Sequence, residues 1–373
     1  MAEPLKNLYG AEVPRAVAEM IFAVYPRFGR EAFLREVLRG YEALELLERG
    51  RKIARAMREY LPDDYSKALR IVLASSRVEV KPRDHAMASF LYYPHLHFVG
   101  TYGLDDFEES MTALHELTKK FTAEFSIRPF LERYPEATLK RLRAWTRDPS
   151  PDVRRLVSEG TRPRLPWAPR LRRFQENPAP VLALLERLKD DSELYVRRSV
   201  ANNLNDIGKD HSDVLVETAN GWMKGASETR RWIVRHALRS LVKQGDPGAL
   251  AVLGFGARPS AELRAVRITP RRVREGDAVT LSFDLVGTGS SRQRIVADFR
   301  IHYVKASGSA NPKVFKLKSL ELGPRETVSL RKTISLKPMT TRRHYPGKHR
   351  VEVLLNGRPF DAGAFVVTAT PDR

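Results

Sequence analysis

The stretch Asp148-Pro149-Ser150-Pro151-Asp152-Val153-Arg154-Arg155-Leu156-Val157 contains a pattern that returns twice further along the chain. Val196-Arg197-Arg198-Ser199-Val200 repeats its second half 43 positions later, again after an Asp and a Ser. Thr229-Arg230-Arg231-Trp232-Ile233 repeats it a further 33 positions on. In the first copy, Ser150 is a natural N-cap and Pro151 occupies the first helical position, where its missing N–H costs nothing. Each copy therefore predicts the start of a helix in a repeated unit.

The helical pattern extends beyond these copies, from residue 13 to about residue 255. Apolar residues recur there with helical spacing, as in Leu114, Leu117, Phe121 and Phe125, which predicts one continuous helix through all four. Pro and Gly interrupt the pattern at short intervals, and no part of it favours a strand. A repeat of about 40 residues is typical of HEAT-like helical pairs, which stack into a solenoid because no pair can bury its apolar face alone.

The residue pattern changes to strict alternation near residue 260, as in Val279, Leu281, Phe283 and Leu285. About seven such segments follow one another, separated by turns that contain Gly, Pro or Ser. The segments are residues 262–268, 277–287, 293–304, 313–320, 326–336, 347–356 and 359–369. This spacing predicts an immunoglobulin- or fibronectin-like sandwich. We therefore expect a mainly α chain of two domains, a HEAT-like α-solenoid over residues 1–259 and a small all-β sandwich over residues 260–373.

The 373 residues carry a net charge of +20, with 65 Lys and Arg against 45 Asp and Glu, and no cysteine. The net positive charge is concentrated in residues 260–373 and in residues 140–173, which favours one polyanionic partner. Nucleic acid is the first candidate, before an acidic membrane surface or an acidic protein. The missing cysteines exclude disulfides, zinc-thiolate sites and a thiol nucleophile. No apolar run is long enough for a bilayer and no secretory pattern begins the chain, so we expect a cytoplasmic protein with no membrane partner.

One face of the repeated helices is polar and basic, as expected for a surface that contacts phosphates. The arginines that the three copies place on it are Arg155, Arg198, Arg231 and Arg235. Glu159 and Asp206 share this face, and Glu124 precedes it. Each of these acids falls near a predicted helix C-terminus, where a negative charge opposes the helix dipole at a cost of about 0.3–1 kcal/mol. Two interpretations remain open: surface acids paired with arginine, or acids that meet a developing positive charge.

Tryptophan and histidine supply further candidates. Trp167 lies between Pro166 and Pro169 without helical neighbours, so stacking on a base or sugar and structural packing both remain open. Trp145 and Trp232 have apolar partners at helical spacing, which favours packing for both. His95 and His97 are two positions apart, but no further ligands cluster near them, and we expect no metal site.

Two stretches of the chain resemble the DNA alkylation repair glycosylases, specifically the AlkC branch. They are Phe-Thr-Ala-Glu-Phe-Ser-Ile-Arg-Pro-Phe at 121–130 and Val-Arg-Arg-Leu-Val-Ser-Glu-Gly-Thr-Arg-Pro-Arg-Leu-Pro-Trp at 153–167. The resemblance covers essentially the whole chain. The related AlkD branch, by contrast, has the solenoid without the sandwich. It implies that the protein removes cationic alkylated bases (3-methyladenine, 3-methylcytosine and 1-methyladenine) from double-stranded DNA in base excision repair. It further implies a monomer that needs no metal or nucleotide cofactor and does not flip the lesion into a deep pocket.

The resemblance also implies which residues form the site. By motif position, the side chains that line it are Glu124, Glu159, Asp206 and Trp167, and those that hold the DNA backbone are Arg155 and Arg162. A cationic base leaves without a general acid, so the acids need only stabilise an oxocarbenium-like sugar and position a water. We expect Asp206 and Glu159 to do most of this, with Glu124 in support. A charged base over Trp167 is favoured over a neutral one by roughly 0.5–2 kcal/mol.

Two other functions share the same charge pattern. A non-catalytic, architectural DNA-binding solenoid would bind duplex DNA without releasing a base. A protein-binding HEAT scaffold would bind DNA weakly and with little dependence on salt. For the basic sandwich, the turns 342–344 and 356–358 are candidates for contacts with the DNA backbone or minor groove.

Overall fold

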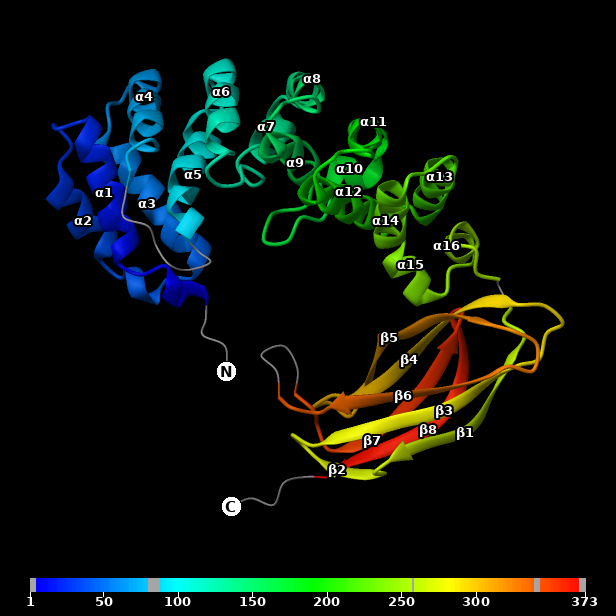
Figure 1. Cartoon of the computed structure of the whole chain (residues 1–373). Coiled ribbons are helices and arrows are strands. Elements are labelled where there is room, and N and C mark those ends of the chain that lie inside the picture. The colour runs from blue at the N-terminus through cyan, green and yellow to red at the C-terminus, as the bar shows by residue number, and fades with distance from the viewer. Residues whose placement is uncertain (1–4, 80–87, 257, 339–342, 369–373) are drawn as a thin grey trace. The chain divides into compact units, whose positions relative to one another are not determined.

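The computed structural model describes residues 5–79, 88–256, 258–338 and 343–368. Within these residues, helices occupy the chain as far as Val252 and strands follow from Ala261 (Figure 1). The predicted fold class, a helical solenoid followed by an all-β sandwich, is thereby confirmed. The chain divides into two compact units, of which the first ends at Asp210 and the second begins at His211. A functional boundary between residues 259 and 260 remains our proposal.

The helices of the first unit pack as stacked pairs (Figure 1). In the described residues they are α1 (Glu12–Val24), α2 (Arg30–Leu38), α3 (Leu46–Tyr60), α4 (Tyr65–Ser75), α5 (Tyr93–Tyr102), α6 (Phe107–Leu117), α7 (Arg128–Arg133), α8 (Pro135–Trp145), α9 (Pro151–Gly160), α10 (Arg172–Glu176), α11 (Ala179–Leu188) and α12 (Leu194–Ile207), with 3-10 turns η1 (Leu5–Leu8), η2 (Tyr41–Ala43) and η3 (Ala88–Tyr92). Helix α3 packs against α5, and α9 against α12, whereas α4 packs against α6 and α8 against α11. Consecutive helices such as α5 and α6 also pack together, so each pair is buried by its neighbours.

Helix α6 is shorter than the sequence predicts. It ends at Leu117, and residues 118–127 form turns and irregular backbone instead of a helix through Phe125. The Thr118 hydroxyl accepts a hydrogen bond from the backbone N–H of Ala123 (3.3 Å), which replaces a bond of the helical ladder. The aromatic rings of this segment pack against rings from η3 and α5 all the same. The apolar spacing therefore continues past the end of the helix, with Leu114 and Leu117 buried in α6 and Phe121 and Phe125 half-buried after it. Helix α9 begins where predicted, with Ser150 at the N-cap position and Pro151 in the first turn, although the Ser150 side chain makes no capping hydrogen bond.

The second unit joins short helices to two β-sheets. Its described helices are α13 (Ser212–Met223), α14 (Glu228–Ala237), α15 (Arg239–Gln244) and α16 (Pro247–Val252). Its described strands are β1 (Ala261–Thr269), β2 (Arg272–Arg274), β3 (Ala278–Gly287), β4 (Gln293–Val304), β5 (Ala310–Leu322), β6 (Thr327–Ser335), β7 (Gly347–Leu355) and β8 (Arg358–Thr368). One sheet has the order β1-β3-β6 and the other β2-β8-β7-β4-β5. All seven predicted strands are present, and only the three-residue β2 was not predicted. Alternate apolar side chains from both sheets form the core between them.

Two glycines bring the helices of the second unit against the sandwich. Gly245 follows α15 and Gly357 lies in the turn between β7 and β8, and both have a φ of 78°. A Cβ atom on Gly245 would lie 2.7 Å from the Cα of Gly357, and one on Gly357 would lie 2.1 Å from the Cα of Gly245. Since real Cβ atoms do not approach backbone this closely, both positions need glycine for contact as well as for conformation.

Asn356 also joins the segment that follows α16 to the sandwich. Its side-chain amide donates to the carbonyl of Gly256 (2.7 Å), and its side-chain oxygen accepts from the N–H of Val296 (2.8 Å). The residue is buried. We expected the turn 356–358 to offer a DNA contact, and for Asn356 this prediction is wrong because its side chain is used inside the unit. Arg342, in the other candidate turn, lies outside the described residues.

Candidate active site

Two of the three candidate acids lie in the last turn of a helix, as the sequence predicts. Glu159 belongs to α9, which ends at Gly160, and Asp206 belongs to α12, which ends at Ile207. Both side chains are buried. Glu124 departs from the prediction because it lies in the turn that precedes α7, not at the end of α6. The acids thus come from three separate segments of the first unit.

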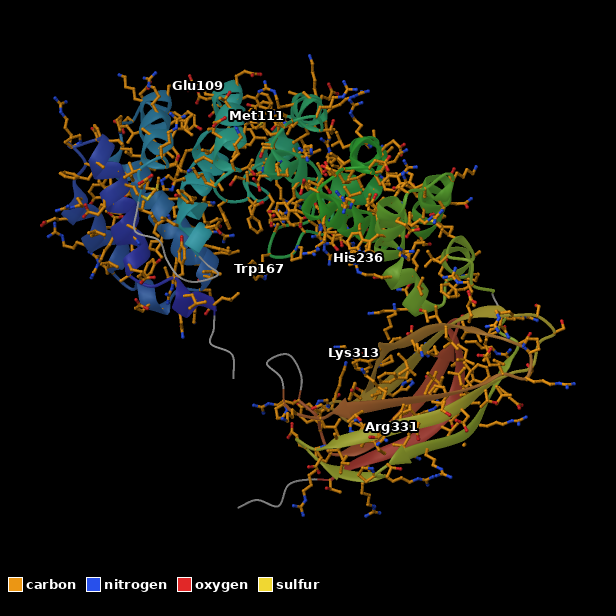
Figure 2. The ribbon with its side chains drawn as sticks, in the orientation of Figure 1. Glu109, Met111, Trp167, His236, Lys313 and Arg331 are labelled. Carbon is orange, nitrogen blue, oxygen red and sulfur yellow. The ribbon has the colours of Figure 1, made fainter. Side chains whose placement is uncertain are left out.

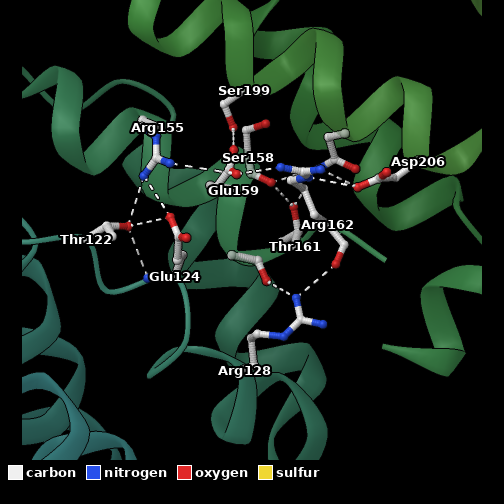
Figure 3. A network of polar contacts seen from close by, with 12 residues as sticks. Thr122, Glu124, Arg128, Arg155, Ser158, Glu159, Thr161, Arg162, Ser199 and Asp206 are labelled. Atoms are coloured by element: carbon white, nitrogen blue, oxygen red, sulfur yellow. Dashed lines mark hydrogen bonds and ion pairs between the residues drawn. The ribbon is translucent and has the colours of Figure 1, made fainter. Parts of the chain in front are cut away.

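The acids and two arginines form a continuous row of alternating charge (Figure 3). Arg155 Nη1 donates to Glu124 Oε2 (2.9 Å), and Arg155 Nη2 lies 3.7 Å from Glu159 Oε1. Arg162 Nη1 donates to the same Glu159 oxygen (2.6 Å), and Arg162 Nε donates to Asp206 Oδ2 (2.8 Å). Each arginine therefore joins two acids, and Glu159 lies at the centre of the row.

The side chains of the row are largely buried, and their charges compensate one another. Burial lowers the pKa of the Arg155 guanidinium, but the charges of Glu124 and Glu159 outweigh burial and leave the pKa raised. The pKa of Arg162 is raised in the same way, with Glu159 and Asp206 as the opposing charges. Both arginines therefore stay cationic. Removing any one acid would leave a buried cation with part of its compensation missing.

Glu159 and Glu124 differ in how completely they are held. The second oxygen of Glu159, Oε2, accepts a hydrogen bond from the Ser199 hydroxyl (2.5 Å), so both of its oxygens are occupied. Glu124 Oε2 accepts from Arg155 and from the Thr122 hydroxyl (2.8 Å). Within the described part of the chain, no hydrogen bond or ion pair reaches Glu124 Oε1. Glu124 thus keeps an acceptor oxygen for a molecule from outside the protein.

Arg128 also supports the site, although it was not among the residues predicted from the sequence. Its guanidinium is buried and donates to the carbonyl oxygens of Gly160 (3.1 Å), Arg162 (2.9 Å) and Pro169 (2.5 Å). These acceptors belong to the end of α9 and to the loop that follows it (Figure 3). Burial lowers the pKa of Arg128 to about 10, which still leaves it charged near neutral pH. Its place in the stretch 121–130 was the available signal, whereas nothing in the sequence pointed to Ser199.

A cavity of about 440 Å³ opens along the row. The charged side chains that line it include Glu124, Arg155, Glu159 and Arg162, and its aromatic side chains include Phe90, Phe121, Phe125, Trp167 and Tyr195. The Arg155 guanidinium lies 4.7 Å from the centroid of the Tyr195 ring. Asp206 is not among the described residues of this lining. Its carboxylate is connected to the cavity through Arg162.

Trp167 projects from the loop between α9 and α10 (Figure 2). Its side chain is 60% exposed, and its φ of 65° lies in the left-handed region that L-residues seldom adopt. A strained backbone that presents a large apolar ring mostly to solvent gains little from packing to offset its cost of about 1–2 kcal/mol. These observations favour the stacking interpretation of Trp167. By contrast, Trp145 is buried, and Trp232 is half-buried and stacks on His236 at 5.1 Å.

The remaining candidate arginines lie outside the charged row. Arg198 is exposed on α12. Arg231 and Arg235 belong to α14 in the second unit, where both are paired with Glu228, at 2.7 and 3.6 Å. The structure therefore places Glu124, Glu159, Asp206, Trp167, Arg155 and Arg162 together in the first unit, whereas Arg231 and Arg235 belong to the second unit.

His95 and His97 were the two histidines considered as possible metal ligands. His95 is fully buried, and its Nε2 lies 3.1 Å from the Ser75 hydroxyl. Throughout the described ranges, no three or more His, Cys, Asp or Glu side chains come together in a way that could hold a metal ion. No helix among the described residues is long and apolar enough to cross a membrane.

Comparisons with known proteins cover the whole chain. Residues 262–369 match the family model of the C-terminal Ig-like domain of the uncharacterised protein YhaZ. The uncharacterised protein YhaZ of Bacillus subtilis (strain 168) is 37% identical over 364 residues, which are 97% of this chain and 99% of that protein. The solved structure of Pseudomonas fluorescens alkylpurine DNA glycosylase AlkC, bound to DNA containing an abasic site analog, is 38% identical. It superposes with a TM-score of 0.92 over 98% of this chain and 100% of that chain.

Proposed function

The chain belongs to the AlkC branch of the DNA alkylation repair glycosylases, and from this premise we propose that it is a DNA glycosylase for alkylated bases. Its substrate is double-stranded DNA in which alkylation has made a base cationic. The bases we propose are 3-methyladenine, 3-methylcytosine and 1-methyladenine. The protein acts as a monomer in base excision repair and hydrolyses the N-glycosidic bond. The reaction needs no metal or nucleotide cofactor, because a cationic base is already a good leaving group.

One observation carries the proposal: the cavity that has a row of acids in its wall and an exposed tryptophan at its rim. Glu124 and Glu159 supply negative charge, and Trp167 supplies an aromatic face. The base carries the positive charge before the C–N bond breaks, and the sugar carries it afterwards, because the base departs neutral. An aromatic face attracts the first, and carboxylates stabilise the second. Because Trp167 is 60% exposed, the lesion can be reached at the surface without being flipped into a deep pocket.

We propose a division of work among the acids that differs from the sequence-based expectation. Glu124 Oε1, which no described residue occupies, holds the attacking water. Glu159, with both oxygens fixed by Arg162 and Ser199, provides a stationary negative charge beside the sugar as the C–N bond breaks. Asp206 acts through Arg162 and is a positioning residue, since its carboxylate does not line the cavity.

Positively charged side chains outside the row bind the DNA backbone. Arg155 and Arg162 were expected to take this role, but their guanidinium groups are engaged by the acids. Arg198, which is exposed on α12, remains available for a phosphate. Such contacts release counterions, so the affinity for duplex DNA falls steeply as the salt concentration rises. A protein-binding scaffold would lack this dependence.

The test is release of free base from a duplex that carries a single 3-methyladenine, measured by chromatography under single-turnover conditions. We expect the wild-type protein to release the base and Glu124→Gln to release it far more slowly. Glu136→Gln, an exposed acid on α8, is the matched control and is expected to behave as wild type. Tight, salt-dependent binding of the duplex without release of the base would contradict the proposal and favour the architectural alternative.

A further inference from the structure

The second unit contains a cavity of about 640 Å³ that the proposed glycosylase function does not use. One wall is formed by α14 and α15, and the other by β4 and β5. Both walls are fixed within one compact unit, because Arg294 Nη1 donates to the carbonyl of Leu253 (2.7 Å) and Gly245 contacts Gly357. The cavity is therefore preformed.

Positive charge lines this cavity in an ordered way. Arg231, Arg235, Arg239 and Lys243 follow one another at intervals of four residues, which places them along one face of α14 and α15. The opposite wall adds Arg294 and Lys316, and the acids in the lining are Glu228 and Asp298. Six cations against two acids leave an excess of four positive charges. A concave surface with this excess favours a ligand that carries more than one negative charge, such as a phosphate ester.

The cavity also has an apolar floor. Val242, Leu253, Phe255 and Val296 line it, and Phe255 and Val296 belong to a small buried cluster. The Arg294 guanidinium lies 4.8 Å from the centroid of the Phe255 ring. Inorganic phosphate would leave this floor uncovered. A ligand with a flat aromatic part would cover it and could also lie against the guanidinium.

A buried acid among the cations adds a third requirement. Asp298 lies at a β-bulge between β4 and β5, and one of its oxygens accepts a long hydrogen bond from the N–H of Leu317 (3.4 Å). Burial raises the pKa of the Asp298 carboxyl, and the Leu317 N–H, Lys316 and Lys243 oppose that rise without reversing it. Neither lysine pairs with it within the described residues. A side-chain acceptor in such a place suits an N–H donor on the ligand.

We infer that this cavity binds a nucleotide: its phosphate lies among the cations of α14, α15 and β5, its base covers the Phe255 floor, and an amino group of the base donates to Asp298. The nucleotide is either a free mononucleotide or an unpaired nucleotide of a DNA strand, since both present the same chemistry. The inference concerns a site separate from the charged row of the first unit, and it holds whether or not the protein removes alkylated bases.

Isothermal titration of the full chain at physiological salt tests the inference. The probes are deoxyadenosine monophosphate, deoxyribose 5-phosphate, inorganic phosphate and a short single-stranded oligonucleotide. We expect the mononucleotide to bind at least about tenfold more tightly than the two phosphates without a base. Lys243→Ala/Lys316→Ala is expected to weaken mononucleotide binding by about tenfold or more. Both lysines are exposed, so the variant should fold normally, as a thermal melt can confirm.

Arg331→Ala is the matched control, because Arg331 is an exposed cation of β6 that does not line the cavity (Figure 2). It is expected to bind every probe as wild type does. Asp298→Asn should reduce the preference for deoxyadenosine monophosphate over deoxythymidine monophosphate, whose base has no amino group. If only the oligonucleotide binds in a way that depends on the two lysines, the inference stands with a DNA strand as the source. Equal binding of inorganic phosphate, or no probe whose binding responds to the lysine variant, would overturn it.

Discussion

Replacing Trp167 with alanine separates a role in excision from a role in packing. The ring is 60% exposed, so its loss should change the free energy of unfolding by no more than about 1 kcal/mol. Alanine keeps the Cβ atom and therefore keeps the unfavourable φ of 65°, so the backbone strain also stays the same. A cation over a tryptophan ring is worth roughly 0.5–2 kcal/mol, so at protein concentrations below saturation release of the cationic base should be about 2–30-fold slower.

The assay compares single-turnover release of 3-methyladenine with the affinity of the same variant for undamaged duplex DNA. We expect the rate to fall within that range while the affinity stays nearly constant. Trp167→Phe should lose less than Trp167→Ala, because phenylalanine retains a weaker aromatic face. Leu194→Ala, which removes another exposed apolar side chain from the same unit, is the control. An equal loss of rate and of duplex affinity, or a large drop in stability, would mean that the ring packs against the protein and would refute the reasoning.

Three further predictions concern buried charge. Glu124→Gln should slow base release by about 100-fold and, because Arg155 loses a charged partner, should also lower the melting temperature; a normal rate would exclude Glu124 as the acid that holds water. Asp206→Asn should lower the free energy of unfolding in urea by about 2–3 kcal/mol, because Arg162 loses a charged partner; unchanged stability would contradict the buried ion pair. Burial lowers the pKa of His95 to about 4 from 6.5, so the unfolded chain binds more protons than the folded chain between these values. Stability should therefore fall by about 2 kcal/mol between pH 7 and pH 5 on account of this residue, and the His95→Gln variant should lose that part of the pH dependence.

The sequence predicted the strands more accurately than the helices, for a physical reason. Alternation along a strand such as β3 has only one meaning, because successive side chains point to opposite faces. Helical spacing has two meanings, since Phe121 and Phe125 are half-buried on irregular backbone after α6 has ended. The three-residue β2 is too short to show a period at all.

For the candidate site, the residues predicted from the sequence lie together in the first unit, but not all of their partners were predicted. Glu159 and Arg162 are three residues apart, and their pairing follows from the geometry of a helix end. The bond between Arg162 and Asp206 joins residues 44 positions apart, and no local pattern specifies it. The arginines were therefore expected to bind phosphates, although the structure pairs them with acids. Arg128 was missed because its partners are backbone carbonyls, which have no signature in the sequence.

The contact between Gly245 and Gly357 determines where the chain can be joined to that of a relative to make a chimaera. A chimaera that exchanges only the strands would set a foreign turn against α15, and any side chain at the meeting point would force the two surfaces apart. The transplantable module therefore begins at His211, with α13 to α16 carried along as part of the graft. Chimaeras joined at His211 should fold. Chimaeras joined at residue 260 should still form the helices and the strands, but the helices and the sandwich should no longer stabilise each other.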